Sequence, residues 1–168
     1  IVIKENEVHL WICYINAKNI YEDEVFYQSI LDHEELARYH RFYYDLHRYS
    51  YLKSHAFVRM VLSRYAPISA REWQFRKNDY GKPEIIPEQN PYRIKFNLSH
   101  THGIAVCSIC LYLDVGVDVE TTVRREPSTV MAASVLSAHE LKNLLSCSPD
   151  RKLNHFLGFW TLKESFVK

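Results

Sequence analysis

Two charged segments in the second half of the chain constrain its fold most. Near the C-terminal end, Trp160, Glu164 and Lys168 are spaced four residues apart, so on a helix they line one face. Upstream, Asp118 and Glu120 are two residues apart, so on a strand they point the same way. A fold that brings this helix face to that strand therefore gathers three carboxylates beside a lysine.

Such a gathering suits a hard divalent cation and a phosphorylated ligand. Magnesium takes oxygen ligands, is usually held by one or two carboxylates, and completes its shell with water and substrate phosphate. An Asp-x-Glu pair on a strand is, by itself, more often an exposed polar face. Together with the helix face, the pair predicts an enzyme that uses magnesium to handle phosphate.

The same residues carry a resemblance to a known family. Four segments follow one another along the chain: Tyr80-Gly-Lys-Pro83, Phe96-Asn-Leu-Ser-His-Thr-His-Gly103, Gly116-Val-Asp-Val-Glu120 and Trp160-Thr-Leu-Lys-Glu-Ser-Phe-Val-Lys168. In this order they resemble the signature of the 4′-phosphopantetheinyl transferases, in their surfactin-type, single-chain branch. The resemblance covers roughly residues 36–168.

The resemblance implies an activity, a cofactor and a set of site residues. The activity is Mg²⁺-dependent transfer of 4′-phosphopantetheine from coenzyme A to a serine of an apo acyl or peptidyl carrier protein, which releases adenosine 3′,5′-bisphosphate. The implied metal ligands are Asp118, Glu120 and Glu164. The implied catalytic residues are Glu164, as base toward the serine directly or through a metal-bound water, and Lys168. Coenzyme A would be bound by Arg38, Arg48, Lys82, Ser99, His100, Lys163 and Lys168. Arg48 has an alternative, because the family's basic residue could instead align with Ser50.

The resemblance also implies an α+β fold of two similar halves about a pseudo-twofold axis. We expect residues 1–113 to form the first half and residues 114–168 to begin the second. The branch continues with further strands, so we expect the second half to be incomplete at its C-terminus.

The apolar pattern predicts the elements from the residues themselves. Strands are predicted at 8–15, 93–98, 103–113 and 115–120, and helices at 22–31, 33–43, 45–65, 128–136, 138–145 and 154–168. Pro67 is expected to end the long third helix. Ser137 and Glu140 predict a capping box at the fifth helix. Residues 78–83 have the composition of a turn.

Hydropathy and cysteine usage bound the location. The apolar run at 104–113 is too short to cross a bilayer, and the first residues lack the features of a signal peptide. Cys107 and Cys110 form a C-x-x-C without a second pair, and on a strand their side chains point to opposite faces. Buried free thiols in a reducing compartment are therefore expected, which predicts a cytoplasmic protein.

The net charge of +1 hides a basic segment. Between residues 38 and 64 one acid, Asp45, faces six cations: Arg38, Arg41, Arg48, Lys53, Arg59 and Arg64. Such a segment attracts an acidic carrier protein, or else is a solvated helix face. Nucleic acid is not expected as a partner, because the acids gather at the predicted site and the chain is near neutral. We expect a monomer. The alternative to the enzyme is a non-catalytic module that binds coenzyme A or a carrier protein.

Overall fold

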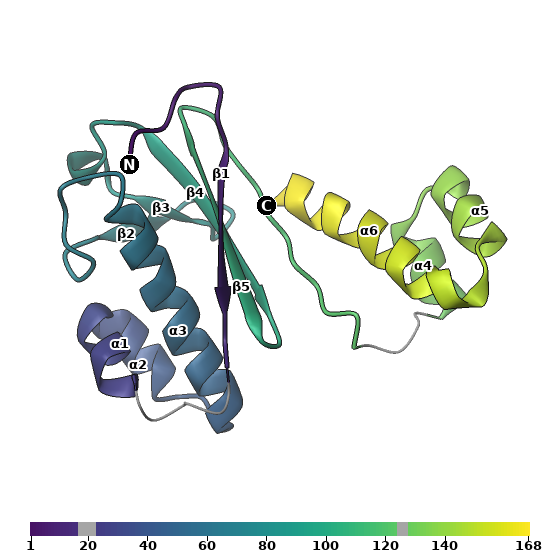
Figure 1. Ribbon diagram of the computed structural model, residues 1–168, viewed down its shortest axis with the longest axis horizontal. Coiled ribbons are helices and arrows are strands. Elements are labelled where there is room, and N and C mark those ends of the chain that lie inside the picture. The colour runs from purple at the N-terminus through teal and green to yellow at the C-terminus, as the bar shows by residue number, and fades with distance from the viewer. Residues whose placement is uncertain (17–22, 124–127) are drawn as a thin grey trace.

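A small antiparallel sheet forms the centre of the first part of the molecule (Figure 1). The computed structural model describes residues 1–16, 23–123 and 128–168. The strands are β1 (His9–Tyr14), β5 (Ile104–Leu111) and β4 (Ile94–Thr101), in the order β1-β5-β4. A second, two-stranded sheet pairs β2 (Phe75–Lys77) with β3 (Pro83–Ile85), and the short 3-10 helix η2 (Pro87–Gln89) follows it.

One face of the three-stranded sheet is covered by α3 (Asp45–Leu62) (Figure 1). Its apolar residues Leu52, Val58, Val61 and Leu62 are all buried, and they pack in the two clusters that include the β5 residues of this face. Two short helices, α1 (Glu24–Ile30) and α2 (His33–Tyr39), lie beside α3. The long helix is therefore the main support of the sheet.

The central strand β5 is buried on both faces. Opposite α3, Ser108 is in register with Leu10 on β1 and with Asn97 on β4. Asn97 and Ser108 are buried, whereas Leu10 at the β1 edge is exposed. The chain that follows β5 covers the β4 side of this face, where the candidate site is found.

The last part of the chain forms three helices: α4 (Thr129–Val135), α5 (Ala138–Ser146) and α6 (Pro149–Val167). They have their own apolar cluster, whose buried members are Ala132, Leu136, Leu144, Phe156 and Leu157. Trp160 is partly buried and packs against this cluster. The C-terminal end of α6 points back toward the sheet (Figure 1).

Most predicted elements are confirmed within the described residues. The capping box of Ser137 and Glu140 is present at the start of α5. The third helix ends at Leu62, before Pro67, and the last helix begins at Pro149, five residues earlier than predicted. Glu22, the first residue of the predicted first helix, lies outside the described residues. The strands β2 and β3, on either side of the predicted turn, were not predicted.

The strand predicted at 115–120 is wrong, because these residues have no regular secondary structure. Their backbone N–H groups bond to side chains instead of a neighbouring strand: Val117 donates to Asn97 Oδ1 at 2.9 Å and Val119 donates to Ser99 Oγ at 3.3 Å. The predicted fold class, a mixture of helices and antiparallel sheets, is nevertheless confirmed.

The cysteines are free thiols, and Cys107 and Cys110 are buried as expected. Burial raises the pKa of Cys107 to about 12, so this thiol stays protonated. Among the described helices, none combines the length and the apolar character needed to cross a membrane.

Candidate functional site

Asp118 lies at the centre of a polar cluster that joins three separate segments. Its Oδ1 accepts hydrogen bonds from Ser99 Oγ of β4 at 2.8 Å and from Lys168 Nζ, after the end of α6, at 2.5 Å. Lys168 Nζ also lies 3.2 Å from Ser99 Oγ. The side chain of Asp118 is only 6% exposed. Ser99 and Lys168, which lie far apart in the sequence and were predicted for the same site, therefore both contact the Asp118 carboxylate.

Asp118 is held in place by the side chains of β4. The bonds from Asn97 and Ser99 to the backbone of 117 and 119 fix the extended segment across the sheet. Lys82 adds a third tie, because its Nζ donates to the carbonyl of Val115 at 2.8 Å. The backbone on both sides of Asp118 is thus held by hydrogen bonds to the side chains of Lys82, Asn97 and Ser99.

Gly116 allows α6 to approach this segment closely. A Cβ at residue 116 would lie 1.8 Å from the carbonyl oxygen of Ser165, a distance that no real contact permits. The absence of a side chain at 116 therefore brings the end of α6, and with it Lys168, to Asp118.

The acids of this region fit a cation in part. Asp118 Oδ2 is buried and has no hydrogen-bond partner among the described residues, which is an unusual state for a carboxylate oxygen. Glu120 Oε2 is buried as well. Glu164 is half-buried on α6. Over the described ranges, no group of three or more His, Cys, Asp or Glu side chains is close enough to hold a metal, so the predicted triad is not assembled.

His100 follows Ser99 on β4 and points to the opposite face. It is exposed where Ser99 is buried, as expected for neighbours on a strand. Partial desolvation lowers the pKa of His100, and the positive fields of His55, Lys168 and Arg38 lower it further. These charges make the surroundings of His100 favourable for an anion.

A cavity of about 440 Å³ lies on the α2–α3 side of the sheet. Its lining contains the basic residues Arg38, Arg76, Lys77 and His55, the acids Asp32, Glu34 and Glu35, and apolar residues such as Phe96 and Leu98. The guanidinium of Arg38 lies 5.4 Å from the centre of the Tyr51 ring. Arg38 therefore lies at the wall of this cavity, and its contact with a phosphate stays a prediction.

Three other predicted residues are not brought to Asp118. Arg48 pairs with Asp45 at 2.5 Å on the same helix and does not line the cavity. Lys163 pairs with Glu140 of α5 at 3.0 Å. Lys82 bonds to Val115 and lines a different cavity of about 320 Å³. Their roles toward coenzyme A stay predictions.

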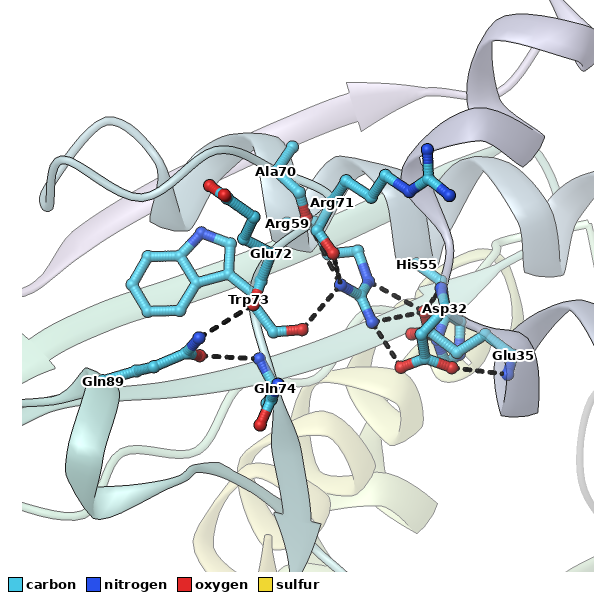
Figure 2. A network of polar contacts seen from close by, with 10 residues as sticks. All are labelled: Asp32, Glu35, His55, Arg59, Ala70, Arg71, Glu72, Trp73, Gln74 and Gln89. Atoms are coloured by element: carbon cyan, nitrogen blue, oxygen red, sulfur yellow. Dashed lines mark hydrogen bonds and ion pairs between the residues drawn. The ribbon is translucent and has the colours of Figure 1, made fainter.

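A polar network is centred on the buried Arg59 (Figure 2), and two of its members, Asp32 and Glu35, also line the cavity of about 440 Å³. Its guanidinium donates to Asp32 Oδ2 at 2.5 Å, to Glu35 Oε2 at 2.7 Å and to the carbonyl of Trp73 at 2.8 Å. Asp32 and Glu35 also form the capping box of α2. The network ties α2, α3 and the loop before β2 together, and it removes Arg59 from the basic surface that the sequence predicted.

Comparison with known proteins decides the family. The family model described as "4'-phosphopantetheinyl transferase, N-terminal" matches residues 19–110, and the one described as "4'-phosphopantetheinyl transferase superfamily" matches residues 114–168. The chain belongs to the 4′-phosphopantetheinyl transferase family. The family recognised in the sequence is thereby confirmed.

Curated members of the 4′-phosphopantetheinyl transferase family align with most of the chain. It is 26% identical to the 4′-phosphopantetheinyl transferase HetI of Nostoc sp., over 100% of this chain and 70% of that protein. It is 28% identical to the transferase Sfp of Bacillus subtilis, over 88% of this chain and 63% of that protein. It is 25% identical to a putative 4′-phosphopantetheinyl transferase of Synechocystis sp., over 84% of this chain and 57% of that protein. The chain thus spans between 57% and 70% of the lengths of these three relatives.

Sequence reasoning missed three residues around this transferase-family site. Asn97 lies in the second of the four signature segments and no role was predicted for it, although its amide oxygen accepts a hydrogen bond from the backbone N–H of Val117. Glu35 and His55, which bond at 2.8 Å, were not singled out as site residues. Their separation by 20 residues on two helices leaves no local signal.

Proposed function

We propose that this chain transfers the 4′-phosphopantetheine group of coenzyme A to a serine of an apo acyl or peptidyl carrier protein. Membership of the family supports this reaction, and the relatives named above are themselves called 4′-phosphopantetheinyl transferases. The chain spans 57–70% of the lengths of those relatives, so the activity in their names is a proposal for this chain.

The observation that carries the proposal is the environment of Asp118. One oxygen is occupied by Ser99 and Lys168, while the other is buried without a hydrogen-bond partner in the described part of the chain. A buried carboxylate oxygen in that state suits a cation as its missing partner. We propose Mg²⁺ there, with Asp118 as chief ligand and Glu120 and Glu164 as further ligands. When bound, Mg²⁺ would stabilise negative charge on the pyrophosphate of coenzyme A.

The residues of the chain would then act on the reacting groups. In the proposed reaction, the carrier's serine oxygen bonds to the phosphorus that bears pantetheine. The bond from that phosphorus to the bridging oxygen breaks, and adenosine 3′,5′-bisphosphate leaves. Glu164 would accept the serine proton as general base. Lys168, already fixed at Asp118 and Ser99, would offer its ammonium group to the phosphate oxygens.

The nucleotide would extend from Asp118 over His100 toward the cavity of about 440 Å³. Arg38 lines that cavity, and its planar guanidinium suits a phosphate. The roles predicted for Arg48, Lys82 and Lys163 form part of the proposal. An acidic carrier protein would dock near the basic surface around α2 and α3.

We also propose that the protein belongs to the surfactin-type branch, folds as two similar halves divided near residue 114, is a monomer and is located in the cytoplasm.

The test is incubation with coenzyme A, Mg²⁺ and an apo carrier protein, followed by intact mass measurement of the carrier. We expect a mass gain of one phosphopantetheinyl group, which disappears when a chelator replaces Mg²⁺. A carrier that stays unmodified, with this chain and with a longer form of the protein, would contradict the proposed function. Binding of coenzyme A without transfer would favour the non-catalytic module.

A further inference from the structure

The backbone on either side of Asp118 is bound by two side chains of β4 in place of a neighbouring strand. Asn97 and Ser99 lie two residues apart on β4, so their side chains point to the same face of the sheet. Asn97 Oδ1 accepts the N–H of Val117 at 2.9 Å, and Ser99 Oγ accepts the N–H of Val119 at 3.3 Å. The spacing of the two side chains on the strand therefore matches the spacing of the two amides that flank Asp118.

The two side chains differ in what else they contact. Ser99 Oγ also donates to Asp118 Oδ1 at 2.8 Å and lies 3.2 Å from Lys168 Nζ, so Ser99 belongs to the polar cluster of the site. Asn97 is 6% exposed, and its amide oxygen bonds to the backbone beside Asp118 instead of to a side chain of the cluster. An effect of Asn97 on Asp118 is therefore transmitted through the backbone of Val117.

Asn97 points away from the core that supports α3. Its neighbours Phe96 and Leu98 pack in the apolar clusters that contain the buried face of α3, and successive residues of a strand point to opposite faces. On β5, Asn97 is in register with Ser108, which is 2% exposed and whose Oγ has no hydrogen-bond partner in the described part of the chain. A substitution at residue 97 can thus change the backbone near Asp118 without removing an apolar residue from the core.

We infer that Asn97 is a positioning residue for the transfer reaction, because its bond to Val117 fixes where Asp118 presents Oδ2. The inference rests on the proposed function, in which Asp118 is the chief ligand of Mg²⁺. Oδ2 is buried and has no hydrogen-bond partner among the described residues, so its position follows from the backbone and from the bonds at Oδ1. Without the Asn97 acceptor, the N–H of Val117 is left unpaired and the backbone has to shift to find another partner. A displacement of about 1 Å at a group that positions the reactants can cost about a hundredfold in rate.

The experiment compares two variants that both remove the amide group of Asn97. Asn97→Leu keeps a similar volume without an acceptor, whereas Asn97→Asp keeps an oxygen acceptor in the same place. In Asn97→Leu, kcat for transfer should fall about ten- to hundredfold, and more Mg²⁺ should be needed for half of the maximal rate. Asn97→Asp should recover much of both losses. A general loss of folded protein would lower the rate and leave the Mg²⁺ concentration at half of the maximal rate unchanged.

Amide hydrogen exchange of the metal-free protein measures the bond itself. In Asn97→Leu, the amide of Val117 should exchange about two- to tenfold faster, as expected for the loss of one hydrogen bond. The amides of β5 should keep their wild-type rates. The matched control is Ser108→Ala, which alters the buried polar residue opposite Asn97 and should change neither the exchange at Val117 nor the Mg²⁺ dependence.

The inference would be overturned by Asn97→Leu that shows wild-type exchange at Val117 or wild-type Mg²⁺ dependence. It would also be overturned if Asn97→Asp were as impaired as Asn97→Leu. A wild-type protein that transfers no phosphopantetheine to the carrier would instead contradict the proposed function itself.

Discussion

At the scale of single residues, the site depends on the different surroundings of the two carboxylate oxygens of Asp118. Asp118 presents Oδ1 to Ser99 and Lys168 and leaves Oδ2 buried. Glu164 lies one helical turn before Lys168, which follows the last residue of α6, so the residue proposed as base and the residue that holds Asp118 are neighbours along the helix.

The role of Glu164 is tested by Glu164→Gln, which keeps the shape and removes the negative charge and the basicity. If Glu164 is the general base, kcat for transfer should fall by about 10² to 10⁴, with the Kd for coenzyme A little changed. Added Mg²⁺ should not restore the rate, whereas it would if Glu164 were only a metal ligand. Asp150→Asn, an exposed acid at the start of the same helix, serves as the control. Wild-type rates in Glu164→Gln would refute both roles.

Glu35 makes the stability of the fold depend on pH. Its pKa is lowered in the folded protein, because the His55 hydrogen bond and the Arg59 charge outweigh the effect of burial. Its contribution to the free energy of unfolding is therefore present above the unfolded pKa of about 4.3, and it is lost as pH falls through the lower folded value. Urea unfolding at several pH values should show a steeper acidic loss in the wild type than in Glu35→Gln. Parallel curves for the two proteins would contradict this role of Glu35.

At the scale of elements, the position of α6 relative to the sheet decides whether the site exists. The helix has its own apolar cluster with α4 and α5, and its C-terminal end meets residues 116–118. The contact depends on the lack of a side chain at Gly116.

Gly116→Ala is expected to abolish transfer by displacing the end of α6. The added Cβ would lie 1.8 Å from the backbone oxygen of Ser165, so the helix end or the segment has to move and Lys168 loses Asp118. Transfer assays report the loss, and far-UV circular dichroism should show that the helices remain. The matched control is Gly158→Ala within α6, where nothing lies within 4 Å of the new Cβ. It should keep activity and gain about 0.5–1 kcal/mol of stability. Normal transfer by Gly116→Ala would contradict the proposed link between helix position and activity.

At the scale of the whole molecule, the sequence predicted the residues of the site better than their contacts. The four segments of the family signature led to Ser99, Asp118 and Lys168, which the structure brings together. Apolar periodicity also located α3 and the hairpin of β4 and β5. These features are local, so the pattern of neighbouring residues carries them.

The features that the sequence did not predict depend on contacts between distant segments. Residues 115–120 have the composition of a strand, yet their N–H groups bond to the side chains of Asn97 and Ser99. Arg59 has the same charge as its neighbours on the basic segment, but two acids from the start of α2 hold it inside the molecule. No periodicity within one element reports such partners.

The central claim, that Asp118 is the core of a phosphopantetheine transfer site, is tested most directly by comparing two aspartates of the same segment. The side chain of Asp118 is 6% exposed, whereas that of Asp114 is 77% exposed and pairs with Lys95 at 3.1 Å. Exposed ion pairs contribute little, so Asp114→Ala should transfer phosphopantetheine within about twofold of the wild-type rate.

The deciding measurement is the initial rate of carrier modification at limiting Mg²⁺, followed by intact mass, for the wild type, Asp114→Ala and Asp118→Ala. The account predicts that Asp118→Ala falls to the rate seen without protein while Asp114→Ala stays active. A rate close to wild type in Asp118→Ala would contradict it.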